Sequence, residues 1–94
     1  MALARMVTFD GVSAERMAEL TKEMDSGEPP AEIPAKEILM LHDPDAQKSV
    51  VVIFFDNDDD YRRGDEALNA MPAGDTPGTR SSVAKYEVAT RMTA

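Results

Sequence analysis

The sequence predicts an α+β fold of the ferredoxin-like type, with a four-stranded antiparallel sheet and two helices on one of its faces. The periodic segments follow the order β-α-β-β-α-β along 94 residues, which is the order of this fold. A short turn between the second and third strand-like segments implies an antiparallel hairpin. Right-handed crossovers then place both helices on the same face of the sheet. We expect a single domain over residues 1–94, since this length suits one small domain.

The first half of the chain reads as a strand followed by a helix. Residues 3–9 alternate in polarity, which favours a strand, and Asp10-Gly11 ends it. Ser13 stands at the position of a helix N-cap, and Gly27 stands where a helix commonly ends. The apolar face expected for this helix consists of Ala14, Met17, Ala18, Thr21 and Met24. Three prolines in residues 28–34 make the next stretch a connector.

The second half begins with the predicted hairpin. Residues 35–42 form its first strand, Asp43-Pro44-Asp45 turns the chain, and residues 49–55 form its second strand. Every position from Val50 to Phe55 is apolar, so this strand presents large side chains to both faces of the sheet. The helices therefore cover one set of these side chains and leave the other set facing away.

A second helix and a last strand complete the expected fold. Asn57 or Asp58 caps the helix, and Pro72 ends it. One helical face is expected to carry Tyr61, Gly64, Leu68 and Met71. Residues 82–92 alternate again and are predicted to be the fourth strand.

The apolar third strand predicts a partner on the helix-free face of the sheet. Exposing a large apolar side chain forfeits roughly 1.5–3 kcal/mol, and three such side chains would consume much of the roughly 5–15 kcal/mol that stabilises a domain. The apolar segment 38–41 in the neighbouring strand adds to this surface. Because symmetric pairs dominate soluble oligomers, we expect a homodimer through this face, with a different protein as the alternative occupant.

Composition argues against several classes of partner and site. The chain has 10 Lys+Arg against 18 Asp+Glu and a formal charge of −8, so it is repelled by phosphate backbones and anionic lipid. We expect no nucleic acid and no membrane as partners. The chain has no cysteine and one histidine, which makes a disulfide framework impossible and a self-contained zinc site unexpected.

The acidic segment Asp56–Asp60 does not read as a calcium loop. Aligned with the EF-hand pattern from Asp56, it has Tyr61 where glycine is needed and Ala67 where a bidentate glutamate is needed. Capping of the second helix explains these carboxylates, and we expect no metal and no cofactor. Arg5 interrupts the apolar opening residues, so a secretory signal is not expected and the predicted location is cytoplasmic.

Several segments resemble a known superfamily. They are Gly-Val-Ser-Ala-Glu at 11–15, the apolar strand at 49–55, the acidic helix start at 56–60 and the closing strand at 80–88. With the order of elements, they are similar to those of the dimeric α+β barrel superfamily and its small proteins resembling antibiotic biosynthesis monooxygenases. The resemblance implies two ferredoxin-like protomers packed face to face, each with a ligand cavity between sheet and helices.

Activities within that superfamily differ, and the resemblance carries over only part of them. Some members are cofactor-free monooxygenases acting on polycyclic aromatic substrates, and others degrade haem. This sequence has no tryptophan and no histidine on its second predicted helix. The asparagine, tryptophan and histidine set of the haem-degrading branch therefore has no counterpart here.

His42 is the candidate catalytic residue. Histidine is the side chain that exchanges protons near neutral pH, and His42 is the single one, expected at the end of the second strand beside Asp43, which could orient its ring. A solvated turn residue is the alternative interpretation.

Tyrosines and methionines are the candidate ligand-binding residues. Tyr61 and Tyr86 could present hydroxyls to a bound carbonyl or phenol, and Met17 and Met71 could line an adaptable apolar pocket. In the alternative interpretation all four pack in the core.

Arg5 and Lys85 lie on strand faces with apolar neighbours. They could bind an anionic group of a ligand or pair with carboxylates such as Glu87.

The function predicted from these observations is that of a homodimeric α+β barrel binding a small apolar or aromatic ligand between sheet and helices. The alternatives are a cofactor-free monooxygenase-like enzyme and a catalytically silent structural or regulatory dimer. A ligand-binding protein requires a pocket of a few hundred Å³ with convergent polar groups, whereas a silent module requires solid packing.

Overall fold

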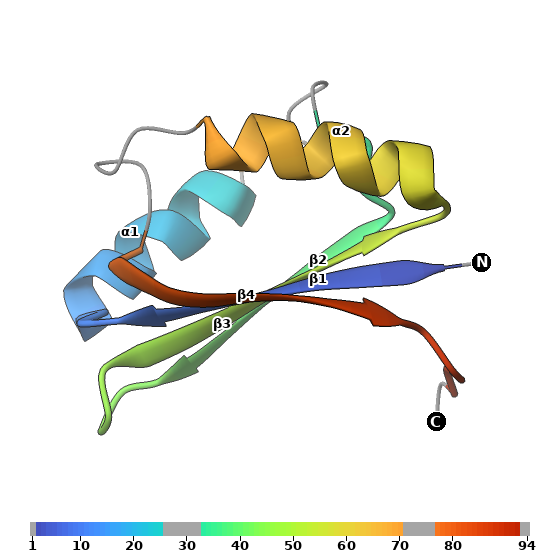
Figure 1. The fold of residues 1–94 in the computed structure, drawn as a ribbon. Helices are drawn as coiled ribbons and strands as arrows, with labels where there is room; N and C mark the ends of the chain where they lie inside the picture. The colour runs from blue at the N-terminus through green and yellow to red at the C-terminus, as the bar shows by residue number, and fades with distance from the viewer. Residues whose placement is uncertain (1, 26–32, 71–76, 93–94) are drawn as a thin grey trace.

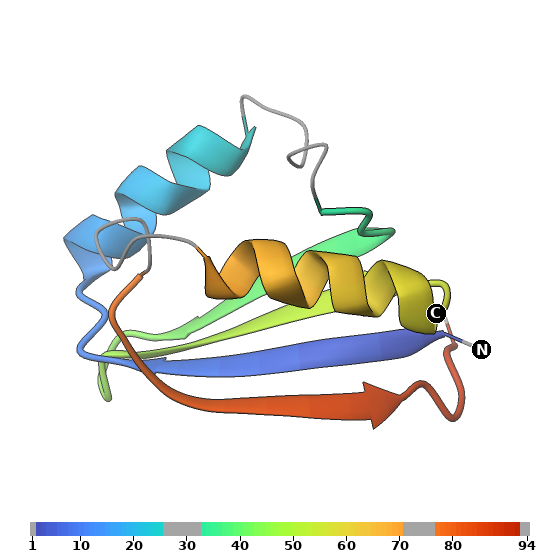
Figure 2. The same cartoon turned by 45° about the horizontal axis from the view of Figure 1, so that its top comes forward.

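The computed structural model describes residues 2–25, 33–70 and 77–92 and confirms the ferredoxin-like α+β fold. Its elements are β1 Leu3–Asp10, α1 Ala14–Asp25, β2 Glu37–Asp43, β3 Lys48–Phe55, α2 Asp58–Asn69 and β4 Thr79–Glu87. The four strands form one antiparallel sheet in the order β2-β3-β1-β4. Figures 1 and 2 show both helices on the same face of this sheet, with β4 along one edge.

The last strand begins and ends earlier than the predicted segment 82–92. Its partner β1 starts at Leu3, which pairs with Glu87, and the final backbone bond runs from Val88 N to Ala2 O at 3.0 Å. The alternating residues after Val88 do not continue the strand. At the other end, a register shift at Thr8 allows pairing to extend to Thr79.

The buried face of α1 differs from the predicted one. Met17 and Leu20 are buried, whereas Ala14, Ala18 and Thr21 are exposed. The helix is therefore rotated toward Leu20, because burying a leucine side chain removes more apolar surface from water than burying alanine or threonine.

The N-cap of α1 is confirmed, since Arg16 N donates to Ser13 Oγ at 3.1 Å. Gly11 ends β1 with a φ of +70°, a conformation that glycine adopts without strain. Gly27 and the side chain of Met24 lie outside the described part of the chain.

The start of α2 follows the predicted capping pattern. Asn57 is the N-cap and accepts the backbone N–H of Asp60 at 2.8 Å. The acidic first turn lies at the positive end of the helix dipole. Tyr61 and Gly64 are buried and Leu68 is half-buried, as predicted. Met71 and Pro72 lie outside the described residues.

The core on the helix side of the sheet is divided into two clusters. One cluster joins Tyr61 of α2 to residues of the sheet, and its members are Leu3, Ile53, Phe55 and Tyr61. The other includes Met17 of α1, and its members are Val7, Phe9, Val12 and Met17. Phe55 and Tyr61 meet edge to face, with ring centroids 5.4 Å apart and planes inclined by 67°. This arrangement favours aromatic pairs and fixes α2 over β3.

A buried arginine also holds α2 on the sheet. Arg5 of β1 is 3% exposed, and its Nε donates to Asp65 Oδ1 at 2.8 Å. Its Nη2 donates to Asn69 Oδ1 at 3.2 Å, an oxygen that also accepts from Arg80 at 2.7 Å. Pairing with a carboxylate, one of the two interpretations of Arg5, is thus confirmed, although the partner is Asp65 and not Glu87.

Gly64→Ala tests how closely α2 approaches β3. A Cβ at Gly64 would lie 2.5 and 2.6 Å from two ring atoms of the buried Phe55. Alanine normally stabilises a helix interior over glycine by about 1 kcal/mol, yet here we expect a net loss of about 1–2 kcal/mol from overpacking. Urea unfolding followed by circular dichroism measures it, with the exposed Glu66→Ala as control. A Gly64→Ala protein as stable as the wild type would contradict this close packing.

Asp65→Ala tests the ion pair of Arg5. Removing one partner of a buried pair costs about 3–5 kcal/mol, and because Asp65 is 34% exposed we expect about 2 kcal/mol after allowing for solvent screening. Arg5→Met, which removes the buried charge itself, should cost less than half as much. The free energy of unfolding measures both. The control is Asp59→Ala, which breaks only an exposed pair with Arg62; an equal loss in this control would refute the argument.

Candidate functional site

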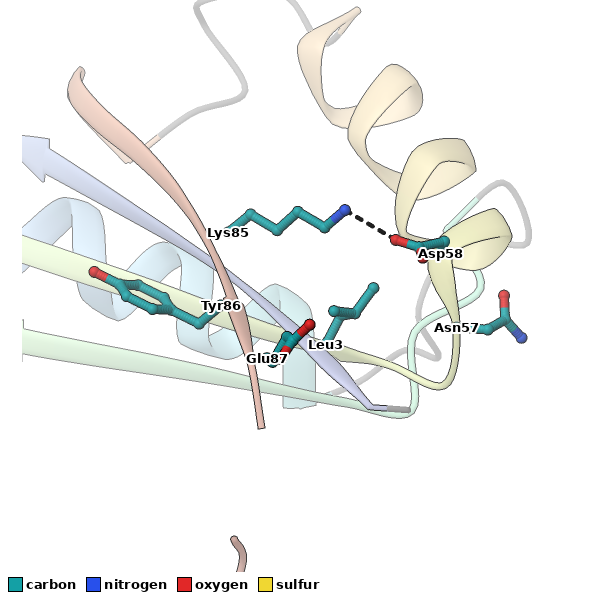
Figure 3. Close-up of a pocket in the computed structure, with 6 residues that line it drawn as sticks. All are labelled: Leu3, Asn57, Asp58, Lys85, Tyr86 and Glu87. Atoms are coloured by element: carbon teal, nitrogen blue, oxygen red, sulfur yellow. Dashed lines mark hydrogen bonds and ion pairs between the residues drawn. The ribbon is translucent and has the colours of Figure 1, made fainter. Parts of the chain in front are cut away.

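A pocket of about 430 Å³ opens between β4 and the first turn of α2. Its lining residues are Leu3, Asn57, Asp58, Lys85, Tyr86 and Glu87. Strand pairing brings Leu3 and Glu87 side by side, and Asp58 starts the helix above them (Figure 3). Residues from the two ends of the chain and from its middle therefore meet at one site.

Alternation along β4 decides which side chains enter the pocket. Lys85 extends toward α2, whereas the ring of Tyr86 points away from Asp58 (Figure 3). Lys85 Nζ lies 2.9 Å from Asp58 Oδ1 and 4.8 Å from the centroid of the Tyr61 ring. The ammonium group is therefore held between a carboxylate and an aromatic face.

The electrostatics of this pair keep both partners charged. The hydrogen bond and the positive charge of Lys85 lower the pKa of Asp58, with a smaller contribution from Arg62. The hydrogen bond to Asp58 correspondingly raises the pKa of Lys85. Burial, together with the negative charge of Asp65, raises the pKa of the Tyr61 phenol. At neutral pH these groups offer fixed charges and a protonated phenol, which suits binding better than proton transfer.

The two candidate tyrosines lie on opposite faces of the sheet. Tyr61 is buried under α2, and Tyr86, although it lines the pocket, is 53% exposed on the helix-free side. Met17 belongs to the core cluster near α1, away from Tyr61. Met71 lies outside the described residues. The structure thus does not bring Tyr61, Tyr86 and Met17 to one site.

His42 makes a structural contact on the helix side of β2. Its Nε2 donates to Val12 O at 3.1 Å and so ties β2 to the residues that precede α1. Asp43, the predicted partner of the ring, instead accepts the backbone N–H groups of Asp45 and Ala46 at 3.2 Å. His42 is not among the residues that line the pocket.

Lys85 and Tyr86 were candidate residues from the sequence, and Glu87 was a possible partner of Lys85, whereas Leu3, Asn57 and Asp58 were not predicted to lie beside them. Alternation placed Lys85 and Glu87 on one face of the last strand, and the N-cap placed Asp58 at the start of the second helix. Their convergence depends on the register of β4 against β1 and on the position of α2, and no local pattern encodes either of these.

The helix-free face of the sheet is the second candidate site. Leu39, Leu41 and Tyr86 are exposed there, by 41%, 54% and 53%. Between them, β1 and β3 contribute Ala4, Met6, Val50, Val52 and Phe54, which are half-buried or buried. The central part of this face therefore consists of apolar side chains from all four strands.

Among the described residues, two ion pairs lie toward the two ends of this apolar face. At one end Arg91 pairs with Glu37 and stacks on Phe54, with its guanidinium 4.6 Å from the ring centroid. At the other end Lys48 pairs with Asp10 at 3.8 Å. At each end of the apolar surface, therefore, a positive side chain is paired with a negative one.

Fold and site together define a ferredoxin-like α+β protein with a small polar pocket and an apolar sheet face. Comparison of the chain with protein-family models, curated proteins and solved structures finds no match. Within the described residues, no three His, Cys, Asp or Glu side chains gather as a metal site would require. None of the described helices has the length and apolar character needed to cross a membrane.

Lys85→Met tests the electrostatics of the pocket. Without the lysine, the pKa of Asp58 should rise toward its ordinary value of 3.8. Because that pKa is lowered in the folded state, the pair stabilises the fold above pH 3.8, and this stabilisation is lost as the pH falls through the lowered pKa. A carboxyl NMR titration of Asp58 measures the change. Lys36→Met, which breaks the pair with Asp56, is the control; an unchanged Asp58 titration in Lys85→Met would contradict the assignment.

Proposed function

We propose that the protein acts as a homodimer in which the helix-free sheet faces of two copies pack together, and that each copy binds a small ligand on the helix side of its sheet. The observation that carries the dimer is the continuous apolar surface across all four strands. An exposed apolar patch of this kind, bordered by polar residues, is typical of a protein interaction site.

The energetics favour burial of this surface. Leu39, Leu41 and Tyr86 each keep about half of their surface in contact with water. Full burial of a large apolar side chain is worth roughly 1.5–3 kcal/mol, so each of these residues would gain roughly half of that in an interface. A dimer counts every residue twice, so these three side chains contribute about 4.5–9 kcal/mol, which offsets much of the roughly 4–15 kcal/mol that bringing two molecules together costs.

The charge distribution supports a second copy as the occupant. The chain carries a net charge of −8, so two copies repel each other unless the contacting surfaces are neutral. The centre of the helix-free face is apolar, and the pairs Arg91–Glu37 and Lys48–Asp10 balance charges toward its ends. A two-fold axis would match this surface with itself, as a symmetric dimer requires.

The pocket between α2 and β4 supports the ligand. Its volume of about 430 Å³ lies within the range of small-molecule sites, and it lies on the side of the sheet where the resemblance implies a cavity. Leu3, which is 5% exposed, and the methylene chain of Lys85 provide the apolar contact for the body expected of the ligand.

A catalytically silent interaction module is the second candidate function. The packing of Leu3, Phe55 and Tyr61 between sheet and α2 favours it, because these side chains occupy space that a large aromatic substrate would need. The cofactor-free oxygenase activity implied by the resemblance stays a prediction, since the contacts described above do not bear on it.

Leu41→Glu tests the dimer. The wild-type protein should elute at twice the chain mass of 10.3 kDa in size-exclusion chromatography with light scattering at about 100 µM. Leu41→Glu should shift it toward the single-chain mass, because the interface would then bury an unpaired carboxylate. Val83→Glu is the matched control, since Val83 is exposed on the helix side of β4. A wild-type protein of 10.3 kDa at this concentration would refute the dimer.

A further inference from the structure

We propose that the pocket between α2 and β4 selects a small ligand that carries an ammonium group next to an apolar or aromatic body. The inference rests on the proposed ligand-binding function and specifies the class of ligand. Three features of the pocket support it: the charges of the lining residues, the partners that these residues already have, and the position of Leu3.

The positive charge in the pocket is already engaged. Lys85 Nζ donates to Asp58 at 2.9 Å and lies over the Tyr61 ring. An anionic ligand would have to compete with the Asp58 carboxylate for this ammonium group. It would also approach a chain with a net charge of −8, whose overall field repels anions.

The negative charge of Glu87, in contrast, is available. Within the described ranges no hydrogen bond or ion pair engages the side-chain carboxylate of Glu87, which acts on Lys85 only through space. Asp58 is compensated by Lys85 and, more weakly, by Arg62. Glu87 is therefore the lining carboxylate that an incoming cation can pair with directly, without breaking an existing contact.

The apolar body of the ligand has a place beside this carboxylate. Leu3 pairs with Glu87 across β1 and β4, and its side chain lies next to Glu87 in the pocket (Figure 3). Leu3 is 5% exposed, so the rest of a molecule whose ammonium group pairs with Glu87 lies against the exposed edge of Leu3 and the methylene chain of Lys85. A pocket of about 430 Å³ has room for one aromatic ring with a two-carbon chain.

Three probes of similar size and different charge test the proposal on the full-length protein. They are 2-phenylethylammonium, neutral 2-phenylethanol and the anion 3-phenylpropanoate, each titrated at pH 7 and followed by backbone amide NMR shifts of the lining residues. We expect the ammonium probe to bind most tightly and its affinity to fall as salt is added. Glu87→Gln should weaken its binding about fivefold and leave the neutral probe unchanged. The control is Glu15→Gln, on the exposed face of α1, which should change neither.

The outcomes separate this inference from the function on which it rests. If the neutral or anionic probe binds as tightly as the ammonium probe, the ligand class is wrong while the pocket remains a ligand site. If Glu87→Gln leaves the ammonium affinity unchanged, the role of Glu87 is wrong. If none of the three probes shifts the lining residues, both the ligand class and the proposed ligand site are overturned, whereas the dimer is judged separately by its mass.

Discussion

The structure depends on one constraint: the central strand β3 is apolar on both faces of the sheet, and the helices cover only one of these faces. In β3, Val51, Ile53 and Phe55 face the helices, and Val50, Val52 and Phe54 face away. A sheet with one wet face normally alternates apolar and polar residues, and this strand does not. The sheet therefore has a packed hydrophobic core on its helix side and a partly exposed apolar surface on its helix-free side.

The packing on the helix side of the sheet is tight. At Gly64 α2 approaches Phe55 so closely that a side chain has no space, and the guanidinium of Arg5 pairs with Asp65 beneath the helix. Both contacts fix α2 over β1 and β3 and leave the edge strand β4 without a helix above it (Figure 2). Val83 and Lys85 consequently keep solvent contact on the helix side, and the pocket forms where Lys85 reaches up to the first turn of α2.

The parts of the fold that follow local rules were predictable from the sequence. The caps at Ser13 and Asn57, the alternation in β1 and the continuous apolar run in β3 depend on neighbouring residues only, and the caps and both strands are confirmed. The face of α1 was not predicted correctly, because a pattern of small residues competed with the single large Leu20. The end of β4 depends on where β1 begins, and the meeting of Asp58, Lys85 and Glu87 depends on both register and helix placement. Such long-range relations are set by packing, and a linear pattern does not contain them.

The two proposed surfaces share a strand but use opposite sides of it. Lys85 and Glu87 face α2, whereas the ring of Tyr86 lies on the helix-free face. A second copy packed on the helix-free face would thus bury Tyr86 and leave the carboxylate of Glu87 open to a ligand. Tyr86 is the one lining residue of the described pocket that belongs to both surfaces, so any coupling between association and ligand binding would have to pass through it. Substitution of Leu41 on β2 changes one surface and substitution of Glu87 changes the other, because a β-strand separates neighbouring side chains onto different faces of the sheet.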